Sequence, residues 1–193
     1  MTADEEDNME EQENDGQHIV MGVSGSIAAY KACSVLRGLI RKGHEVRVVM
    51  TESAQNLICP STFRSLSGNP VVTGLWLPDN RAELVHIELA EWVDLLAIVP
   101  ATANIIGKVA CGIGDEILST TWMACDCPRL LAPAMNDRMW DSIAVQNNVE
   151  QLRQRENVEF VDPVAGMLAS GKDAGTGHLA PVEEIVERID GLG

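Results

Sequence analysis

The 193-residue chain lacks a long hydrophobic run, a basic N-terminal segment and a clustered set of cysteines. No apolar stretch reaches the roughly 20 residues that a bilayer-spanning helix needs. The first 17 residues contain no lysine or arginine, unlike the start of a secretory signal. The five cysteines are odd in number and scattered, so they are not a disulfide framework. These absences argue against a membrane-spanning or secreted protein, and we expect a cytoplasmic one.

Basic residues are also scarce, with 14 lysines and arginines against 29 acidic residues and a formal net charge of −15. Eight of the acidic residues lie within residues 1–17, so the rest of the chain carries only −7. A segment this charged cannot bury enough apolar surface to offset its ordering entropy. We therefore predict that residues 1–17 are a disordered acidic tail. The moderate charge of the remainder argues against nucleic acid or an anionic membrane as partner.

From residue 18 onward, short apolar runs alternate with segments of helical apolar spacing. The predicted strands are 18–23, 45–50, 70–76, 95–101, 128–134 and 158–163. The predicted helices are 27–42, 51–66, 86–94, 102–125 (interrupted by glycines), 142–156 and 181–192. Apolar strands separated by helices indicate a parallel sheet covered on both faces. The sequence thus predicts a single doubly wound α/β domain over residues 18–193.

In such folds, ligands bind beyond the carboxyl ends of the strands. The first such loop, "GVSGSIAAYK" (22–31), is not the G-x-G-x-x-G dinucleotide fingerprint. Its small residues, the hydroxyls of Ser24 and Ser26 and the following helix N-terminus still suit a phosphate group. The alternative is a tight strand-to-helix turn without a ligand.

Hydroxyl and amide side chains follow two further strands. Thr51 and Ser53 come after the second strand, and Thr102 and Asn104 come after the fourth. Either pair can serve as helix caps, or it can contact a ligand. Two neighbouring crossovers that end in hydroxyls favour a mononucleotide phosphate over a dinucleotide.

Three other features invite a functional interpretation. His86, in "HIELAEW", is the first candidate for proton transfer, although a lone histidine is more often a surface or core residue. The glycine-rich stretch 166–177 is either a surface loop or a mobile lid. The string "PAMNDRMW" (133–140) places one amide between two large, soft apolar side chains, an order that core packing does not require.

Five segments, taken in order, resemble the flavin-containing cysteine decarboxylases: "GSIAAYK", "HIELAEW", "PATANIIGK", "APAMNDRMW" and "LASGKDAGTG". The most similar branch decarboxylates phosphopantothenoylcysteine in coenzyme A biosynthesis. The resemblance implies a Rossmann- or flavodoxin-like flavoprotein domain over 18–193 that binds FMN. It also implies a homo-oligomer, a trimer or a dodecamer of trimers, with the site at a subunit contact. A separate synthetase protein would make the substrate.

The resemblance also assigns residues. Gly25, Ser26, Ile27, Thr51, Ser53, Thr102, Ala103, Asn104 and Ala134 would line FMN. Asn136 would bind the substrate carboxylate through its amide NH₂, and His86 would act as acid or base beside the flavin. Met135, Met139 and Ala169 would complete the substrate site, where the methionines form pliable apolar walls. No metal is implied.

The implied chemistry explains why a redox cofactor serves a decarboxylation. Removing a hydride from the carbon that bears sulfur gives a thioaldehyde, whose C=S group accepts the electrons left by departing CO₂. The resulting enethiol is then reduced, which gives 4′-phosphopantetheine without net oxidation.

The sequence departs from the family at one point. Many members carry a cysteine proton donor in L-A-C-G-x-x-G-x-G-R, where this chain has Ser170 for the cysteine and His178 for the arginine. A serine hydroxyl is a far weaker acid than a thiol. Three alternatives follow. His178, Lys172 or water supplies the proton; the reaction stops at an enethiol, as in decarboxylases of C-terminal peptidyl cysteine; or the chain is a non-catalytic, protein-binding relative.

Overall fold

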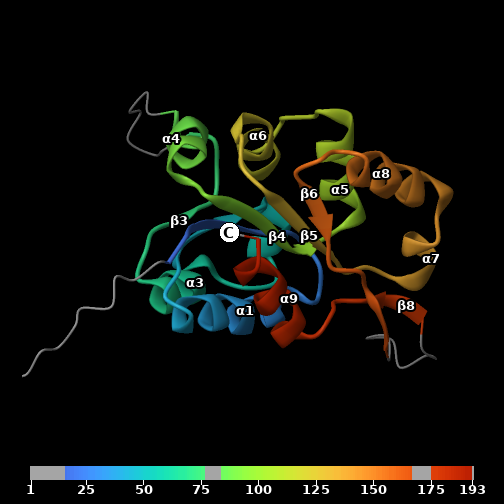
Figure 1. Ribbon diagram of the computed structural model, residues 1–193, viewed down its shortest axis with the longest axis horizontal. Helices are drawn as coiled ribbons and strands as arrows, with labels where there is room; N and C mark the ends of the chain where they lie inside the picture. The colour runs from blue at the N-terminus through green and yellow to red at the C-terminus, as the bar shows by residue number, and fades with distance from the viewer. Residues whose placement is uncertain (1–15, 77–83, 167–174, 193) are drawn as a thin grey trace, which may run out of the picture.

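The computed structural model describes residues 16–76, 84–166 and 175–192 (Figure 1). The predicted acidic tail, apart from residues 16 and 17, and most of the predicted lid lie outside these ranges. The described elements are β1 (His18–Val23), α1 (Ala29–Arg41), β2 (Glu45–Met50), α2 (Glu52–Gln55), α3 (Pro60–Ser67), β3 (Val71–Val72), α4 (Val85–Trp92), β4 (Leu95–Ala101), α5 (Ala103–Cys111), α6 (Ile117–Ala124), β5 (Arg129–Pro133), α7 (Asp137–Trp140), α8 (Ile143–Arg153), β6 (Val158–Phe160), β7 (Val164–Gly166), β8 (Gly175–His178) and α9 (Val182–Asp190).

The main sheet has six parallel strands in the order β3-β2-β1-β4-β5-β6. This is the order of doubly wound nucleotide-binding sheets, in which the chain reverses direction across the sheet between β1 and β4. The predicted parallel sheet is therefore confirmed. The reversal opens a crevice beyond the carboxyl ends of these two strands.

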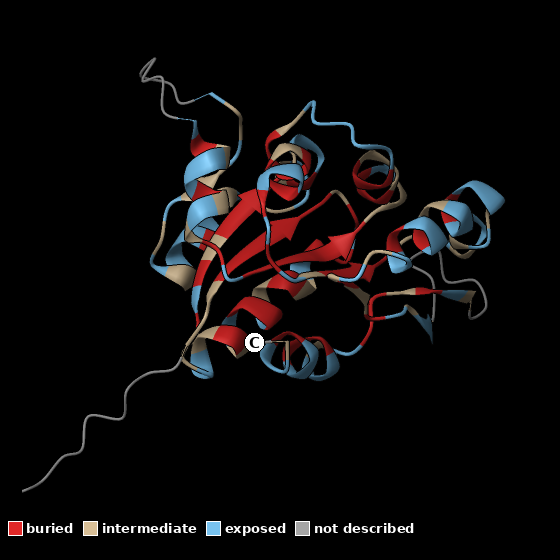
Figure 2. Ribbon diagram, turned by 45° about the horizontal axis from the view of Figure 1, so that its top comes forward, coloured by how far each residue is buried: buried red, intermediate tan, exposed pale blue. Residues whose placement is uncertain are grey.

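Helices cover both faces of the sheet, as predicted. In Figure 1, α1, α3 and α9 lie on one side, and α4, α5, α6 and α8 lie on the other. Alternate residues of each strand feed one of two apolar clusters, so Ile19 and Met21 pack toward the first group while Val20 packs toward the second. The strands are consequently the most buried part of the molecule (Figure 2).

Strand β4 is buried at every position, which explains why its sequence is continuously apolar. Its pairing with β5 shifts register between Ile98 and Ala101, on either side of Pro100. The Val99–Pro100 peptide bond is cis. The strand ends at Ala101, as predicted.

The predicted helix at 51–66 is wrong as a single element. It divides into α2 and α3 because Pro60 occupies the first turn of a new helix, where its missing N–H costs no hydrogen bond. The glycine interruption expected within 102–125 is confirmed at Gly112, which ends α5 with φ 69°. The hairpin of β7 and β8 was not predicted, since glycines are depleted in strands.

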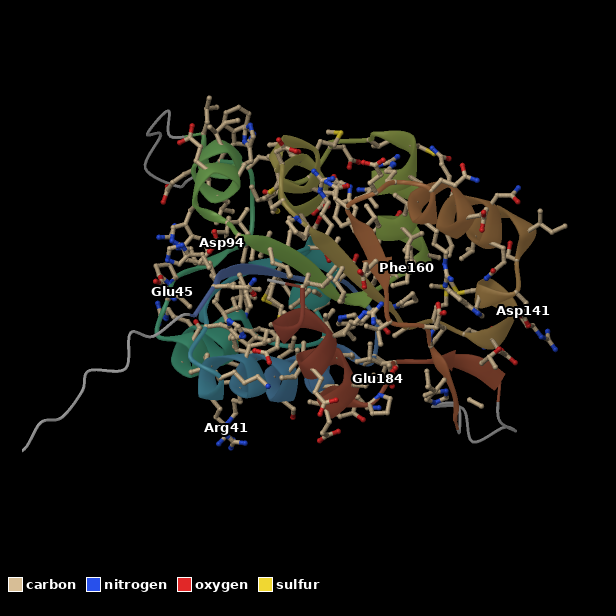
Figure 3. The ribbon with its side chains drawn as sticks, viewed as in Figure 1. Arg41, Glu45, Asp94, Asp141, Phe160 and Glu184 are labelled. Atoms are coloured by element: carbon tan, nitrogen blue, oxygen red, sulfur yellow. The ribbon has the colours of Figure 1, made fainter. Side chains whose placement is uncertain are left out.

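The amino end of the sheet is closed by polar contacts. His18 stacks on Trp92 with ring centroids 4.7 Å apart, and its backbone N–H donates to Asp94 at 2.7 Å. Glu45 and Asp94, which start β2 and precede β4, lie together on the left of Figure 3, whereas Asp141 beside α7 lies on the right. The crevice expected for a doubly wound sheet lies at the opposite, carboxyl end.

In the described ranges, no helix is long and apolar enough to cross a membrane. All five cysteines are free thiols, as expected.

The core of the sheet gives a stability prediction. Ile98 in β4 is fully buried, so Ile98→Ala should lower the free energy of unfolding by about 2–5 kcal/mol, because it removes packing and leaves a cavity. Ile143 at the start of α8 is 78% exposed, and Ile143→Ala should change the same quantity by less than about 0.5 kcal/mol. Urea unfolding of the two variants measures the difference; equal losses would contradict the burial pattern.

Candidate functional site

The hydroxyl of Ser24 joins the carboxyl ends of β1 and β4. It donates to the Pro100 carbonyl at 2.7 Å and accepts from the Thr102 backbone N–H at 3.0 Å. Ala134, after β5, donates its N–H to the Ala101 carbonyl at 3.0 Å. Three loops at this edge are thus tied into one surface. Ser24 is buried and its proton is already committed, so it is not the phosphate donor that the sequence suggested.

The loops after β1 and β2 meet at Gly25. A Cβ on this residue would lie 2.4 Å from the Cβ of Ser53, so a side chain cannot be accommodated without movement. The Thr51 backbone N–H donates to the Val23 carbonyl at 3.1 Å. Gly25 is therefore required by close packing, which brings the small-residue loop against the start of α2.

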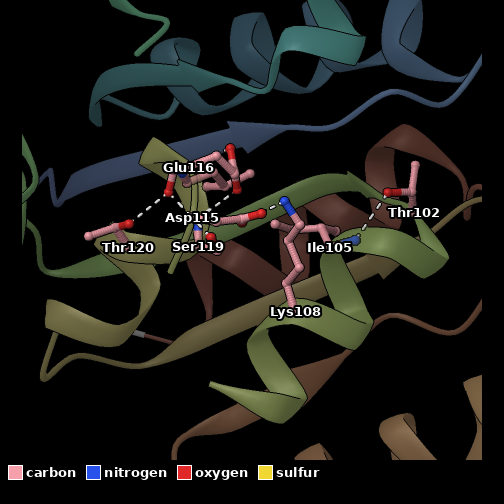
Figure 4. Close-up of polar contacts among 8 residues, drawn as sticks. Thr102, Ile105, Lys108, Asp115, Glu116, Ser119 and Thr120 are labelled. Carbon is pink, nitrogen blue, oxygen red and sulfur yellow. Dashed lines mark hydrogen bonds and ion pairs between the residues drawn. The ribbon is translucent and has the colours of Figure 1, made fainter. Parts of the chain in front are cut away.

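Capping explains two of the predicted ligand-binding hydroxyls. Thr51 accepts from Ala54 N–H at 3.3 Å, and Thr102 accepts from Ile105 N–H at 3.4 Å, at the first turns of α2 and α5. Figure 4 shows Thr102 in this role, with the other end of α5 held by Lys108 and Asp115. The Lys108 ammonium lies 2.6 Å from Asp115, and this hydrogen bond lowers the pKa of that carboxyl.

A cavity of about 680 Å³ opens at this edge. Its volume falls within the roughly 300–1,000 Å³ of small-molecule sites. It is lined by the loop after β1, the first turns of α1, the segment from Ala134 to α7, and the end of β8: Gly25, Ser26, Ile27, Ala28, Tyr30, Lys31, Thr102, Ala134, Met135, Asn136, Met139, Gly177, His178 and Leu179.

Asn136 is the N-cap of α7, and this role fixes its amide. Its Oδ1 accepts from the Arg138 backbone N–H at 3.0 Å, which identifies the oxygen end of the side chain. The NH₂ group therefore remains as a hydrogen-bond donor on a residue that lines the cavity. An amide held in this way can bind an anionic acceptor such as a carboxylate.

Strand β8 packs directly on the segment that carries Asn136. The Met135 N–H donates to the Gly177 carbonyl at 2.9 Å, and a Cβ on Gly177 would lie 2.2 Å from the Met135 oxygen. The next residue, His178, also lines the cavity. The backbone contact thus places an imidazole and the Asn136 amide on the same cavity wall.

His86 is not brought to this cavity. It lies in the first turn of α4, which packs against α6 and stands on the left in Figures 1 and 2, whereas α7 and β8 lie on the right. Its Nδ1 is buried and has no hydrogen-bond partner among the described residues. The sequence prediction that joined His86 and Asn136 in one site is therefore not met within a single chain.

The remaining predicted residues divide into three groups. On the cavity wall are Gly25, Ser26, Ile27, Thr102, Ala134, Met135, Asn136 and Met139. Off the wall are Thr51, Ser53, Ala103 and Asn104, although Ser53 packs against Gly25. Ala169 and Ser170 lie outside the described residues. The sequence analysis missed Tyr30 and Lys31. They follow Ile27 by three and four residues in the predicted helix 27–42, and this spacing could have indicated a shared face.

Among the described residues, no group of histidine, cysteine or acidic side chains could hold a metal ion.

The shared hydroxyl yields a prediction about the scaffold. Ser24→Ala should lower the free energy of unfolding by about 1–3 kcal/mol, because it leaves buried polar groups at Pro100 and Thr102 without their partner. Ser142, the N-cap of α8, makes no side-chain cap bond, so Ser142→Ala is a matched control with little expected effect. Chemical denaturation of both proteins compares them, and similar midpoints would contradict the role of Ser24.

Comparison with known proteins adds relatives to this geometry. Residues 7–192 match the model of the family described as Flavoprotein. The chain is 43% identical over 183 residues to the coenzyme A biosynthesis bifunctional protein CoaBC of Mycolicibacterium smegmatis. This alignment covers 91% of the chain but only 43% of the relative, so the chain spans less than half of that protein's length.

Two solved structures share the fold. The FMN-dependent cysteine decarboxylase SpaF superposes with a TM-score of 0.75 at 32% identity, covering 90% of this chain and 94% of its own. A cysteine-to-serine variant of PPC decarboxylase, complexed with pantothenoylaminoethenethiol, superposes with a TM-score of 0.79 at 28% identity, covering 91% and 97%. With nearly its whole length matched by the family model, the chain belongs to the Flavoprotein family.

Proposed function

We propose that this protein is a flavin-dependent carboxy-lyase that converts 4′-phosphopantothenoylcysteine into 4′-phosphopantetheine, a step of coenzyme A biosynthesis. The observation that carries the proposal is the cavity wall, where the Asn136 amide donor stands between two methionines and opposite a small-residue loop. The names of the CoaBC relative and of the PPC decarboxylase structure support this substrate. An enzyme of this kind would act in the cytoplasm, with a synthetase supplying its substrate.

The residues around the cavity fit FMN. Gly25 leaves the backbone after β1 without a side chain, and Ser26 and Thr102 add polar groups beside it. Ile27, Met135 and Met139 supply apolar surface suited to a planar ring. Gly25, Ser26, Ile27, Thr102 and Ala134 would hold the cofactor directly, and Ser53, which packs against Gly25, would support them. Thr51, Ala103 and Asn104 do not line the cavity and have no direct part in this proposal. Bound FMN would supply reversible hydride acceptance at the carbon that bears sulfur.

The chain's own contribution would be binding and orientation. The Asn136 NH₂ would hold the substrate carboxylate, while the cap bond to Arg138 N–H prevents the amide from presenting its oxygen instead. The methionine side chains would keep water from this region, which strengthens the hydrogen bond that remains. Loss of CO₂ from a carboxylate so held would require no further movement of the amide.

A second candidate function is oxidative decarboxylation of a C-terminal peptidyl cysteine. The similarity to SpaF and the serine at position 170 favour it. Product mass separates the two functions. The coenzyme A reaction gives a saturated thiol without oxygen uptake, whereas the peptidyl reaction consumes oxygen and gives a product lighter by two hydrogen atoms. If neither substrate reacts, a non-catalytic role in binding a partner protein gains support.

The placement of His86 supports a site shared between subunits. If His86 and Asn136 act on one ligand, a second copy must supply one of them. Both regions expose apolar side chains: Ile27, Tyr30 and Met139 near the cavity, and Leu84 and Ile87 near His86. Two different patches that dock on each other form a heterologous contact, which gives a ring where the rotation between copies closes and a filament where it does not. A cyclic trimer, alone or within a dodecamer, is the assembly that we propose.

Complementation tests this assembly. His86→Asn and Asn136→Asp should each be inactive. A mixed cyclic trimer of the two variants has one junction in three where an intact His86 meets an intact Asn136. Co-expression with two affinity tags and tandem purification should therefore recover about a third of wild-type activity. Mixing Asn136→Asp with Asn136→Ala should recover none, and a shared site is ruled out if the first mixture is equally inactive.

The role of Asn136 has its own test. Asn136→Asp keeps an oxygen to accept from Arg138 N–H, so α7 should remain capped and FMN should stay bound. It replaces the amide donor by a negative charge that repels the substrate carboxylate, so turnover should fall by at least about 100-fold. CO₂ release and flavin absorbance measure the two effects.

Asn147 is exposed on α8 and provides the control, since Asn147→Asp introduces the same charge away from the cavity and should keep full activity. Turnover retained by Asn136→Asp would remove Asn136 from its proposed role.

A further inference from the structure

Decarboxylation without net oxidation consumes one proton for each substrate. The bond between the substrate carbon and its carboxylate breaks, CO₂ leaves, and the electron pair ends in a new C–H bond on that carbon. Some group must therefore deliver a proton to this position. We propose that His178 is the acid that does so, an inference that rests on the proposed function.

His178 stands where the carboxylate would be bound. It follows Gly177 in β8, whose carbonyl accepts from Met135 N–H at 2.9 Å, and Met135 precedes Asn136. Both His178 and Asn136 line the same cavity. A group that protonates the carbon left by CO₂ has to lie near the place where the carboxylate was held, and His178 shares the cavity with Asn136.

The imidazole is positioned by the neighbouring strand. His178 pairs with Val164 across the β7–β8 hairpin, and its ring packs over Gly166. A Cβ on Gly166 would lie 2.8 Å from the ring's Cγ and 3.1 Å from its Nδ1. The ring thus occupies the space that any side chain at position 166 would fill. Such packing limits the ring to few orientations, which is what an acid acting on one carbon requires.

The other titratable groups of the described cavity region are less suited to this step. Tyr30 and Lys31 line it from α1, and Asp137 of α7 packs against β8 at Gly175. An imidazolium gives up a proton near neutral pH more readily than a phenol or an ammonium does, and a carboxylate at neutral pH accepts protons. In the step itself, an imidazolium N–H bond breaks and the C–H bond forms. The neutral imidazole then regains its proton from water.

His178→Gln tests the assignment with the flavin-loaded protein and 4′-phosphopantothenoylcysteine. The variant should form saturated thiol at least about 100-fold more slowly than wild type, the scale of a lost general acid. CO₂ should still be released, with a product lighter by two hydrogen atoms detected by mass spectrometry. His18, exposed at the amino end of the sheet, provides the control, and His18→Gln should give the wild-type product at the wild-type rate.

Two further variants separate chemistry from packing. His178→Ala should recover saturated product when imidazole is added, even if the glutamine variant fails to bind flavin. Gly166→Ala should displace the ring and raise the share of the lighter product without removing the imidazole. Unchanged product in His178→Gln, or no response of His178→Ala to imidazole, would overturn the inference.

The products that the wild-type protein forms distinguish a failure of the His178 role from a failure of the proposed decarboxylase function. Wild-type protein that releases CO₂ but yields only the lighter product would overturn the role of His178 and keep the decarboxylase function. Wild-type protein that releases no CO₂ from this substrate would remove both.

Discussion

The site depends on one buried hydroxyl. Ser24 lies where the sheet reverses its winding, between β1 and β4, and its oxygen bonds the Pro100 carbonyl and the Thr102 N–H together. The connections after β1 and β4 turn to opposite faces of the sheet, and this divergence of the loops opens a crevice in doubly wound folds. Here the backbone at the base of the crevice is held in place, because the loops after β1, β4 and β5 are hydrogen-bonded to one another. The backbone that would contact a cofactor is consequently held by the strands themselves.

Asn136 lies beside these loops, and the two ends of its amide group have different roles. The oxygen of Asn136 caps α7, and in the proposed function the nitrogen would bind the substrate. An aspartate would cap the helix equally well, and a serine or threonine would cap it too, but none of them offers an N–H donor. The residue type is thus explained by the combination of the two tasks. This resolves why an asparagine lies between two methionines in "PAMNDRMW": the methionines line or flank the cavity, and Trp140 packs against the core behind them.

The sequence predicted most of the fold because its strongest signals are local. Continuously apolar strands such as Leu95–Ala101 and the helix-ending Gly112 were identified correctly from pattern alone. Part of the cavity wall was also predicted, through a resemblance that fixes positions such as Ser26 and Asn136. Two kinds of structural feature could not be predicted from the sequence. Thr51 and Thr102 both cap helices, and of the two only Thr102 also lines the cavity; backbone geometry decides this difference, and sequence does not contain it. The separation of His86 from Asn136 depends on how distant elements pack, and a motif list in chain order carries no such information.

Three glycines of the stretch 166–177 lie within the described residues, and they have a packing role that composition alone does not indicate. Glycines between residues 166 and 177 resemble a flexible lid when only their frequency is considered. In the described part of this stretch, each one is instead a point of close contact. A Cβ on Gly175 would lie 2.3 Å from the Cβ of Asp137, one on Gly177 would meet the Met135 carbonyl, and one on Gly166 would meet the His178 ring. The absence of side chains allows β8 to lie against the Asn136 segment and allows an imidazole to lie against β7. At these positions glycine brings two functional side chains to one wall, and replacing it by alanine would disturb their placement before it changed any chain flexibility.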